Sequence, residues 1–287
     1  IKEEYQKYQE KADQLQEEIV INGERKKVIA AGPGTGKTTL FEKICRRNIK
    51  EGKENNLVLS FINELVDDLR DDLENIAEVR TIHSFALTRL KEDFGVSDFN
   101  FYFNLSSLIK RDYKIIQGKE KDFRKTLHNL SKDEEALDFY SERRKYYHCF
   151  NPESSIFCLM KFYQRNPNSI PSYSQILVDE FQDFNKLECK LIELLSKRSP
   201  ILLVGDDDQS LYTFKNAKPS LIREKVRSDE YTSFDENLPF CFRCPEVVVN
   251  SFKDVVTKAK KQNFLENRIS KSYEYFNRPF IGICNSY

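Results

Sequence analysis

The stretch AAGPGTGKTTL at residues 30–40 has the residue types that bind phosphate. Its glycines let backbone N–H groups converge on an anion, and a following helix would add the partial positive charge of its N-terminus. Lys37 is spaced to reach the β- and γ-phosphates of a nucleotide, and the Thr38 hydroxyl is spaced to bind Mg²⁺. Ala31 stands where the strict pattern opens with glycine. The alternative is a flexible glycine-rich turn, and the lysine–threonine pair favours the phosphate site.

Two acidic residues directly follow the apolar residues 176–178. Hydrolysis of a nucleoside triphosphate needs a carboxylate near Mg²⁺ and a group that orients or deprotonates the attacking water. Asp179 is the candidate for the metal, and Glu180 is the candidate for the water. The alternative is a pair of acids that favours the start of a helix.

A second polar group follows the apolar run 201–204 in the stretch ILLVGDDDQSLYTFKNA. Its three adjacent aspartates repel one another unless a cation or hydrogen-bond donors lie nearby. Gln209 carries both a donor and an acceptor, so it is a candidate sensor of the γ-phosphate. The alternative is an aspartate-rich surface turn.

These groups need strands and helices that bring them together. Apolar runs separated by segments with helical spacing predict a parallel α/β sheet flanked by helices. Ligands of such sheets bind beyond the carboxyl ends of the strands, where the candidate residues lie. We also expect an N-terminal helix over 2–19. The predicted strands are 27–31, 57–61, 176–178 and 201–204, and the predicted helices include 62–76 and 186–197.

Residues 91–172 interrupt this alternation. They are rich in Lys, Glu, Phe and Tyr, and they predict a mostly helical insertion between two strands of the sheet. Stretches such as FRKTLH and YSERRKYYHCF place aromatic residues beside basic ones, a combination that can stack bases and contact phosphates. The alternative is the core and surface of a small helical bundle, which we favour for most individual residues.

Composition limits the function classes. The chain has 46 basic and 46 acidic residues, so a nucleic-acid site must be a local patch. Its seven cysteines are irregularly spaced, which is typical of a reduced intracellular protein. No apolar stretch approaches the roughly 20 residues that span a membrane, and no secretory signal opens the chain. The sequence predicts a cytoplasmic protein without a membrane partner.

Several motifs together resemble the UvrD/Rep-like superfamily 1 DNA helicases, in order and in spacing. Chance resemblance over such an ordered set is very improbable, and the matches run from about Gln16 to Arg243. Cys241 and Cys244 also have metal or redox spacing, but the motif explains that segment better. The matching segments are AGPGTGKT at 31–38, LVLSFINEL at 57–65, RTIHSFA at 80–86, VDEFQDFN at 178–185, VGDDDQSLYTFKNA at 204–217 and LPFCFRC at 238–244.

The resemblance implies a RecA-like P-loop NTPase fold that binds ATP and Mg²⁺, and it implies roles for matching residues. Gln16 would recognise adenine, Thr38 and Asp179 would hold Mg²⁺, and Glu180 would be the catalytic base. Lys37, Gln209 and Arg243 would act on the phosphates, with Arg243 as an arginine finger. The remaining expected ATP-binding residues are Gly32, Pro33, Gly34, Thr35, Gly36 and Thr39, and the expected contacts to single-stranded DNA are Phe61, Asn63, His83 and Phe214.

Some residues depart from the family pattern. Glu64 stands where the family usually has Lys, and Lys215 with Asn216 replaces the usual Arg-Gly. Cys241 and Phe242 replace Asn-Tyr before the expected arginine finger. The change at Glu64 removes a positive charge near the expected DNA path. The expected ATP-site residues Lys37, Thr38, Asp179, Glu180, Gln209 and Arg243 are intact.

The resemblance also predicts how the chain is divided. Because residue 1 is Ile and the later motifs of a second lobe are missing, we expect a fragment, a processed product or a natural half-motor. The expected parts are a RecA-like lobe in two pieces at 1–90 and 173–245, the insertion at 91–172, and a linker with the start of an incomplete second lobe at 246–287.

The function implied is an ATP-hydrolysing helicase or translocase that moves on single-stranded DNA, with 3′ to 5′ polarity expected from the resemblance alone. The alternative is a DNA-binding regulatory ATPase that works as one component beside a nuclease or another partner, for example in anti-phage defence, without processive unwinding. A nuclease or a repair protein is therefore a candidate partner.

Overall fold

The structure is a computed structural model of the 287-residue chain. It describes residues 2–32, 34–61, 63–94, 99–209, 217–234, 238–244, 246–262 and 274–275.

The centre of the molecule is a six-stranded parallel sheet in the order β3-β2-β6-β7-β1-β8. Its inner strands read as nearly unbroken apolar runs because helices cover both of their faces. The predicted parallel α/β class is therefore confirmed. The strands are β1 (Lys26–Ala30), β2 (Asn56–Ser60), β3 (Glu78–Thr81), β6 (Gln175–Val178), β7 (Ile201–Gly205) and β8 (Thr232–Ser233).

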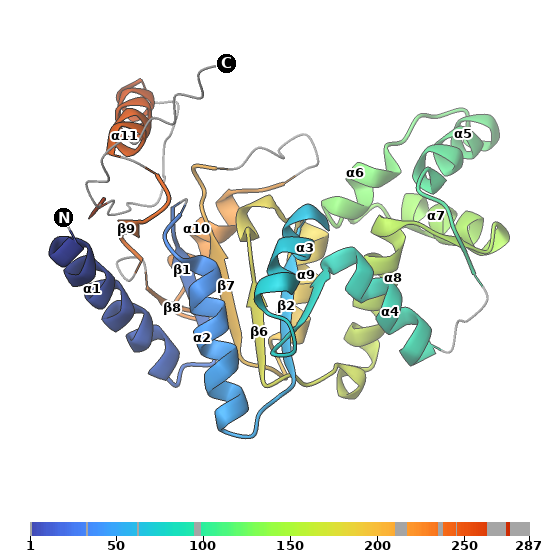
Figure 1. The fold of residues 1–287 in the computed structure, drawn as a ribbon. Coiled ribbons are helices and arrows are strands. Elements are labelled where there is room, and N and C mark those ends of the chain that lie inside the picture. Colours follow the sequence, from blue (N-terminus) through green and yellow to red (C-terminus); the bar gives the residue numbers. More distant parts are fainter. Residues whose placement is uncertain are drawn as a thin grey trace, which may run out of the picture.

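One face of the sheet is covered by three helices, which lie in front of it in Figure 1. Val58, Leu177 and Leu202 of the sheet pack there against Ile19, Phe41 and Leu69 of these helices. The predicted N-terminal helix over 2–19 is confirmed as the first of them. They are α1 (Lys2–Ile21), α2 (Lys37–Lys50) and α3 (Asn63–Asp72).

The opposite face packs against a second set of helices. Leu57, Ile176 and Leu203 of the sheet share one apolar core with Phe85, Leu159 and Leu191. Two of these helices begin with a capping box, in which an asparagine side chain accepts a hydrogen bond from the third helical residue. The set is α4 (Ile82–Phe94), α8 (Pro152–Arg165), α9 (Lys186–Leu195) and α10 (Ser220–Val226).

The residues between β3 and β6 form a mostly helical lobe at the right of Figure 1. Its apolar residues, such as Leu105 and Phe123, belong to the same core as one face of the sheet. The expected division at residue 91 falls inside α4, so the domain boundaries remain a proposal. Besides α8, the lobe contains α5 (Leu105–Gln117), α6 (Phe123–His128), α7 (Glu134–Tyr146) and a parallel pair of short strands, β4 (Asn100–Phe101) and β5 (Cys149–Phe150).

The C-terminal part of the described chain returns to the front face beside α1 in Figure 1. Its elements are β9 (Phe240–Cys241), α11 (Glu246–Lys261) and β10 (Glu274–Tyr275), and β9 pairs with β10. Residues 276–287, at the end of the expected linker and second-lobe segment 246–287, lie outside the described residues. No helix among the described residues is both long and apolar enough to cross a lipid bilayer.

Candidate ATP-binding and hydrolysis site

Three loops that follow adjacent strands meet at one edge of the sheet. β6, β7 and β1 are neighbours, with Val178 opposite Leu203 and Ala30 opposite Gly205. The loops that leave these three strands carry the candidate phosphate, metal and sensor residues. A parallel sheet places such loops together because all its strands point the same way.

The loop after β1 has the geometry of an anion cradle. Gly34 and Gly36 have φ values of 69° and 85°, which favour glycine. The Thr35 hydroxyl donates a hydrogen bond of 3.0 Å to the Gly32 carbonyl and closes the loop on itself. No side chain caps α2, which begins at Lys37. The first N–H groups of α2 are thus aimed at the place where a phosphate would bind.

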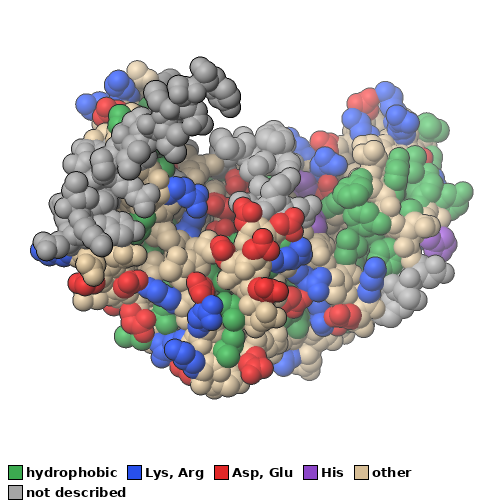
Figure 2. Space-filling view, in the orientation of Figure 1, with side chains coloured by type: hydrophobic (Ala, Val, Ile, Leu, Met, Phe, Trp, Pro, Cys, Tyr) green, Lys and Arg blue, Asp and Glu red, His purple; other side chains and the backbone are tan. Residues whose placement is uncertain are grey.

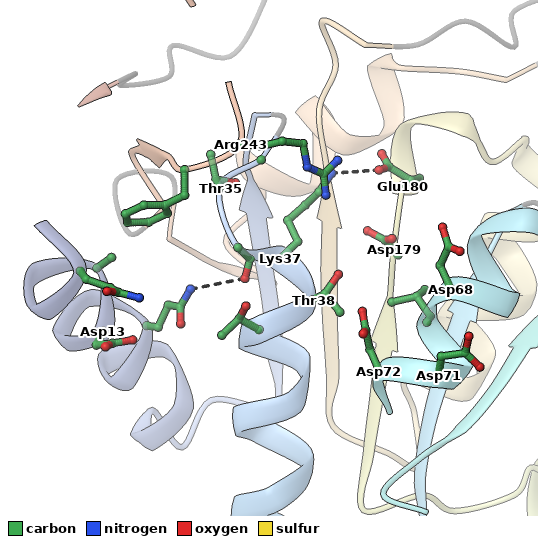
Figure 3. Close-up of a pocket in the computed structure, with 18 of the residues that line it drawn as sticks. Asp13, Thr35, Lys37, Thr38, Asp68, Asp71, Asp72, Asp179, Glu180 and Arg243 are labelled. Carbon is green, nitrogen blue, oxygen red and sulfur yellow. Dashed lines mark hydrogen bonds and ion pairs between the residues drawn. The ribbon is translucent and has the colours of Figure 1, made fainter. Parts of the chain in front are cut away.

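The segment that carries Arg243 lies directly on this loop. The Phe242 N–H donates a hydrogen bond of 2.9 Å to the Gly34 carbonyl. A Cβ added at Gly34 would lie 2.5 Å from the Cβ of Arg243. Gly34 therefore needs to be glycine for its backbone angle and also for the close approach of this segment. Figure 3 shows Arg243 reaching over the loop toward Lys37 and Glu180.

Lys37 and Glu180 form an ion pair across the site, with 3.0 Å between Lys37 Nζ and Glu180 Oε1. Burial alone would lower the pKa of Lys37, but Glu180 and then Asp179 outweigh it and raise that pKa. Burial alone would raise the pKa of Glu180, but Lys37 and a hydrogen bond from Gln182 lower it. Both groups are therefore charged near neutral pH.

Asp179 is a buried carboxylate, 8% exposed, with one oxygen, Oδ1, that has no hydrogen-bond partner. Burial raises its pKa to about 6, although the charge of Lys37 opposes this rise. Thr38 and Asp179 face the same opening in Figure 3. A hard divalent cation takes oxygen ligands, so a hydroxyl and an unsatisfied carboxylate oxygen fit Mg²⁺.

Gln182 is a site residue to which the sequence analysis assigned no role. Its Nε2 donates a hydrogen bond of 2.7 Å to Glu180 Oε2, and its Oε1 accepts one of 2.8 Å from the Asp206 N–H. Its side chain is 1% exposed. The available signal in the sequence was a neutral amide two residues after the acidic pair. Its second partner, the Asp206 N–H directly after β7, is visible only in the fold.

Gln209 lies on the same network. Its Nε2 donates a hydrogen bond of 2.5 Å to Asp206 Oδ2, and its own side chain lines the cavity beside Glu180. Hydrogen bonds and the ion pair thus connect Lys37 to Gln209 through Glu180, Gln182 and Asp206. A displacement of Gln209 would reach Glu180 through these contacts.

Gln16 on α1 lies against the phosphate loop although it is 15 positions before Ala31. Its Nε2 donates a hydrogen bond of 3.3 Å to the Gly36 carbonyl. Its side chain is 4% exposed, and its Oε1 is buried without a hydrogen-bond partner. A buried amide oxygen without a donor is costly unless a ligand supplies one. The amino group of adenine is a donor of this kind.

Most of these residues line one cavity of about 780 Å³, while Gln182 and Asp206 are not part of its lining. Three aspartates of α3, at positions 68, 71 and 72, also line it, and Figure 3 shows them opposite α2. The sequence analysis did not single them out. Two of the expected ATP-site residues do not line the cavity: Gly32 is buried, and Pro33 lies outside the described residues. The expected residues that do line it are Gln16, Gly34, Thr35, Gly36, Lys37, Thr38, Thr39, Asp179, Glu180, Gln209 and Arg243.

The structure describes the side chains of only two of the four residues expected to contact DNA. Phe61 is 9% exposed, and its ring packs edge-on against Phe184 with 5.7 Å between centroids. His83 is partly exposed at the start of α4, with Nε2 3.5 Å from Glu188 Oε1. Asn63 begins α3, but its side chain lies outside the description, as does the whole of Phe214. A DNA role for these residues stays a prediction.

Comparison with known proteins identifies the family. A family described as an AAA domain matches residues 16–215, which is most of the chain. The chain belongs to this family. Within it, the AAA domain described here is of the UvrD/Rep-like superfamily 1 type, and the predicted resemblance is confirmed.

The relatives of this AAA domain are distant, and the chain matches only part of each. The ATP-dependent DNA helicase Rep of Buchnera aphidicola subsp. Acyrthosiphon pisum is 27% identical over 87% of the chain and 45% of its own length. DNA helicase II of Haemophilus influenzae is 25% identical over 80% of the chain and 38% of its own length. An ATP-dependent helicase/nuclease protein of Lactobacillus gasseri is 24% identical over 78% of the chain and 17% of its own length. The chain therefore spans less than half the length of these relatives.

Proposed function

We propose that this AAA domain binds and hydrolyses ATP as the first motor lobe of a DNA helicase or translocase that moves on single-stranded DNA. The observation that carries the proposal is one shared cavity. The loops after β1, β6 and β7 bring Lys37, Asp179, Glu180 and Gln209 to it, and the segment after β9 brings Arg243. Two of the relatives named above, an ATP-dependent DNA helicase Rep and a DNA helicase II, support the same activity.

ATP binding in this proposal begins with a competition for Lys37. In the structure Lys37 Nζ lies 3.0 Å from Glu180 Oε1. The β- and γ-phosphates would draw Lys37 away, because they carry more negative charge than one carboxylate. Glu180 then keeps its hydrogen bond from Gln182 and presents its other oxygen to the attacking water. Exchange of partners by Lys37 thus prepares the base only when nucleotide is bound.

The remaining site residues bind and orient the nucleotide. Gln16 would accept a hydrogen bond from the adenine amino group through its unsatisfied Oε1. Thr38 and Asp179 would hold Mg²⁺, which when bound neutralises charge on the phosphate oxygens. Arg243 would contact the γ-phosphate, and Gln209 would transmit its presence through Asp206.

We propose that the DNA contacts, the partner and the cellular location are also those expected of a helicase of this type. Phe61, Asn63, His83 and Phe214 would meet single-stranded DNA, with 3′ to 5′ movement. The insertion at 91–172 and the linker at 246–287 would be separate parts of the motor. A cytoplasmic location and a nuclease or repair partner remain predictions, the latter supported by relatives with helicase/nuclease names.

The test is displacement of a strand from a duplex with a 3′ single-stranded tail by the longest available form of the protein. ATP-dependent displacement that a 5′ tail does not support would agree with a 3′ to 5′ helicase. DNA-stimulated ATP hydrolysis without displacement would favour the second candidate, a regulatory ATPase that works beside a nuclease. Absence of ATP hydrolysis under every DNA condition would contradict both.

A further inference from the structure

The helical lobe contains a second cavity of about 910 Å³, lined by α4, α7, α8, β5 and Phe99. It shares no lining residue with the ATP cavity. In Figure 1 these elements lie on the side of the molecule away from α1 and α2. Its volume falls within the ~300–1,000 Å³ range of small-molecule sites.

The walls of this second cavity are aromatic. Phe99, Phe150, Phe157 and Phe162 all border it. The rings of Phe99 and Phe150 are in contact, with 4.6 Å between centroids. Phe99, Phe157 and Phe162 are only partly buried. Aromatic ring surface is therefore left available to a flat ligand, because the protein covers these three side chains incompletely.

The same cavity is lined by four cations. Arg144, Lys145, Lys161 and Arg165 border it, together with two acids, Glu134 and Asp138. The whole chain has 46 basic and 46 acidic residues, so this excess of positive charge is local. Among the described residues, no ion pair joins any of these four cations to a carboxylate. Neighbouring arginines of the lobe do pair, as Arg143 does with Asp112.

Two of the cations already lie over the aromatic walls. The Arg144 guanidinium carbon is 4.3 Å from the centroid of Phe150, and Lys161 Nζ is 5.6 Å from that of Phe157. Such cation–π contacts hold the charges at the cavity without neutralising them. Figure 2 shows hydrophobic and basic side chains side by side on this lobe.

We propose that this cavity binds a nucleotide unit, with its base against the phenylalanine rings and its phosphate at Arg144 and Lys161. An uncharged apolar ligand would make no use of the four cations, which outnumber the two acids of the lining. A simple inorganic anion would make no use of the rings. A phosphate joined to a flat ring satisfies both, and stacking accepts any base.

The nucleotide unit has two possible sources, a single strand or a free nucleotide. The strand source rests on the proposed function, because it makes the cavity a second contact for the DNA on which the motor moves. The free-nucleotide source does not depend on that function. The experiment therefore uses one probe for each source.

The test compares two charge-matched double variants of the 287-residue chain. Arg144→Gln with Lys161→Gln removes two cavity charges and keeps an unbranched, polar side chain at both positions. The control, Lys110→Gln with Arg111→Gln, removes two exposed charges of α5 that do not line the cavity. The probes are oligo(dT), followed by fluorescence anisotropy, and dTMP, followed by equilibrium dialysis with saturating Mg-ADP in the other site.

We expect the cavity variant to bind oligo(dT) about tenfold more weakly or worse, since loss of stacking or phosphate contacts costs that much per base. The slope of log affinity against log salt should fall by about 1.4 for two lost phosphate contacts to a single strand. The control should stay within about twofold, and thermal unfolding of both variants should match the parent. Loss of saturable dTMP binding in the cavity variant alone would establish the free-nucleotide source.

Equal effects of the two variants on oligo(dT), together with no cavity-dependent binding of dTMP, would overturn the proposal. This failure differs from failure of the proposed function. If oligo(dT) binds and stimulates ATP turnover but the cavity variant changes neither, the motor assignment stands and the cavity proposal falls. If oligo(dT) does not bind the parent chain at all, the strand source falls with the motor assignment, and dTMP binding decides the cavity.

Discussion

Gln182 joins the candidate catalytic base to the neighbouring strand: its amide nitrogen lies 2.7 Å from Glu180 Oε2. The same amide accepts a hydrogen bond from the Asp206 N–H at the end of β7. Glu180 itself has a φ of 50°, in the left-handed region. A non-glycine residue there is held by its surroundings, and Gln182 supplies a hydrogen bond that fixes its carboxylate.

Removal of the Gln182 side-chain amide should slow ATP hydrolysis and leave ATP binding almost unchanged. We expect Gln182→Ala to lower ATP turnover roughly 10- to 100-fold, because misplacement of a base by about 1 Å costs that much. The affinity for ATP should change less than threefold, since Gln182 is not among the residues that line the cavity. Steady-state turnover and nucleotide titration measure the two effects.

The control for Gln182→Ala is Gln175→Ala, at the opposite end of β6, which should leave turnover unchanged. Gly205→Ala is an independent way to move Gln182, because its Cβ would lie 2.5 Å from Gln182 Oε1. It should reproduce the loss of turnover. Full turnover in both Gln182→Ala and Gly205→Ala would contradict the positioning role.

Gly34→Ala should weaken ATP binding far more than the same substitution at Gly52, another glycine with a left-handed backbone. Gly34 and Gly52 have similar φ values of +69° and +74°, but a Cβ at Gly52 would meet nothing within 4 Å. Gly52→Ala should therefore cost only the backbone strain of about 1 kcal/mol. Gly34→Ala should also push away the Arg243 segment and weaken ATP binding about tenfold or more. Equal losses in the two variants, by thermal unfolding and ATP titration, would argue against contact between the loop and Arg243.

Asp179 should make the stability of the nucleotide-free chain depend on pH. Its pKa in the fold, about 6, lies above the ordinary 3.8, so the folded chain binds more protons than the unfolded chain between these values. Its contribution to stability therefore falls as pH rises from about 4 to about 6. Above pH 6 the neutral variant Asp179→Asn should be more stable than the parent by a few degrees.

The thermal midpoints of Asp179→Asn and the parent should therefore converge toward pH 5 and separate at pH 7.5. Saturating Mg-ADP should raise the midpoint of the parent more at pH 7.5 than at pH 5, because the proton and Mg²⁺ compete for the same carboxylate. A difference between the two proteins that does not change with pH would show that Asp179 is not the group that titrates.

Gln16→Ala should weaken selection of adenine. The variant loses the buried amide oxygen that lacks a donor in the free chain, so the affinity for ATP should fall about tenfold while that for GTP stays within about twofold. Gln14→Ala, on the exposed side of the same helix, is the matched control. An equal loss for ATP and GTP would indicate that Gln16 only supports the phosphate loop through Gly36.

The sequence predicts the inner part of this fold well because its strands are buried on both faces. β1, β2, β6 and β7 each contain a run of at least three apolar residues. The loops after β1, β6 and β7 carry the candidate ATP-site residues. β3 and β8 lie at the sheet edges. Their sequences, EVRT and TS, carry no such pattern, so the sequence analysis did not identify them.

The site was predictable where the chemistry is local in the chain. Lys37 and Thr38 follow from the spacing of the loop, and Asp179 and Glu180 follow from their place after a strand. The role of Gln182 was not predictable, because its second partner is the backbone N–H of Asp206, which directly follows another strand, β7. The approach of Arg243 to Gly34 likewise depends on the path of the chain after the last strand of the sheet. The pattern of apolar residues in the sequence does not predict that path.

The most direct test of the central claim is ATP turnover by the 287-residue chain with and without single-stranded DNA, with Glu180→Gln as the comparison. We predict turnover that DNA stimulates and that Glu180→Gln abolishes, while Glu180→Gln still binds ATP. Turnover in Glu180→Gln equal to that of the parent would contradict the assignment of Glu180 as the base and, with it, the catalytic role of this cavity.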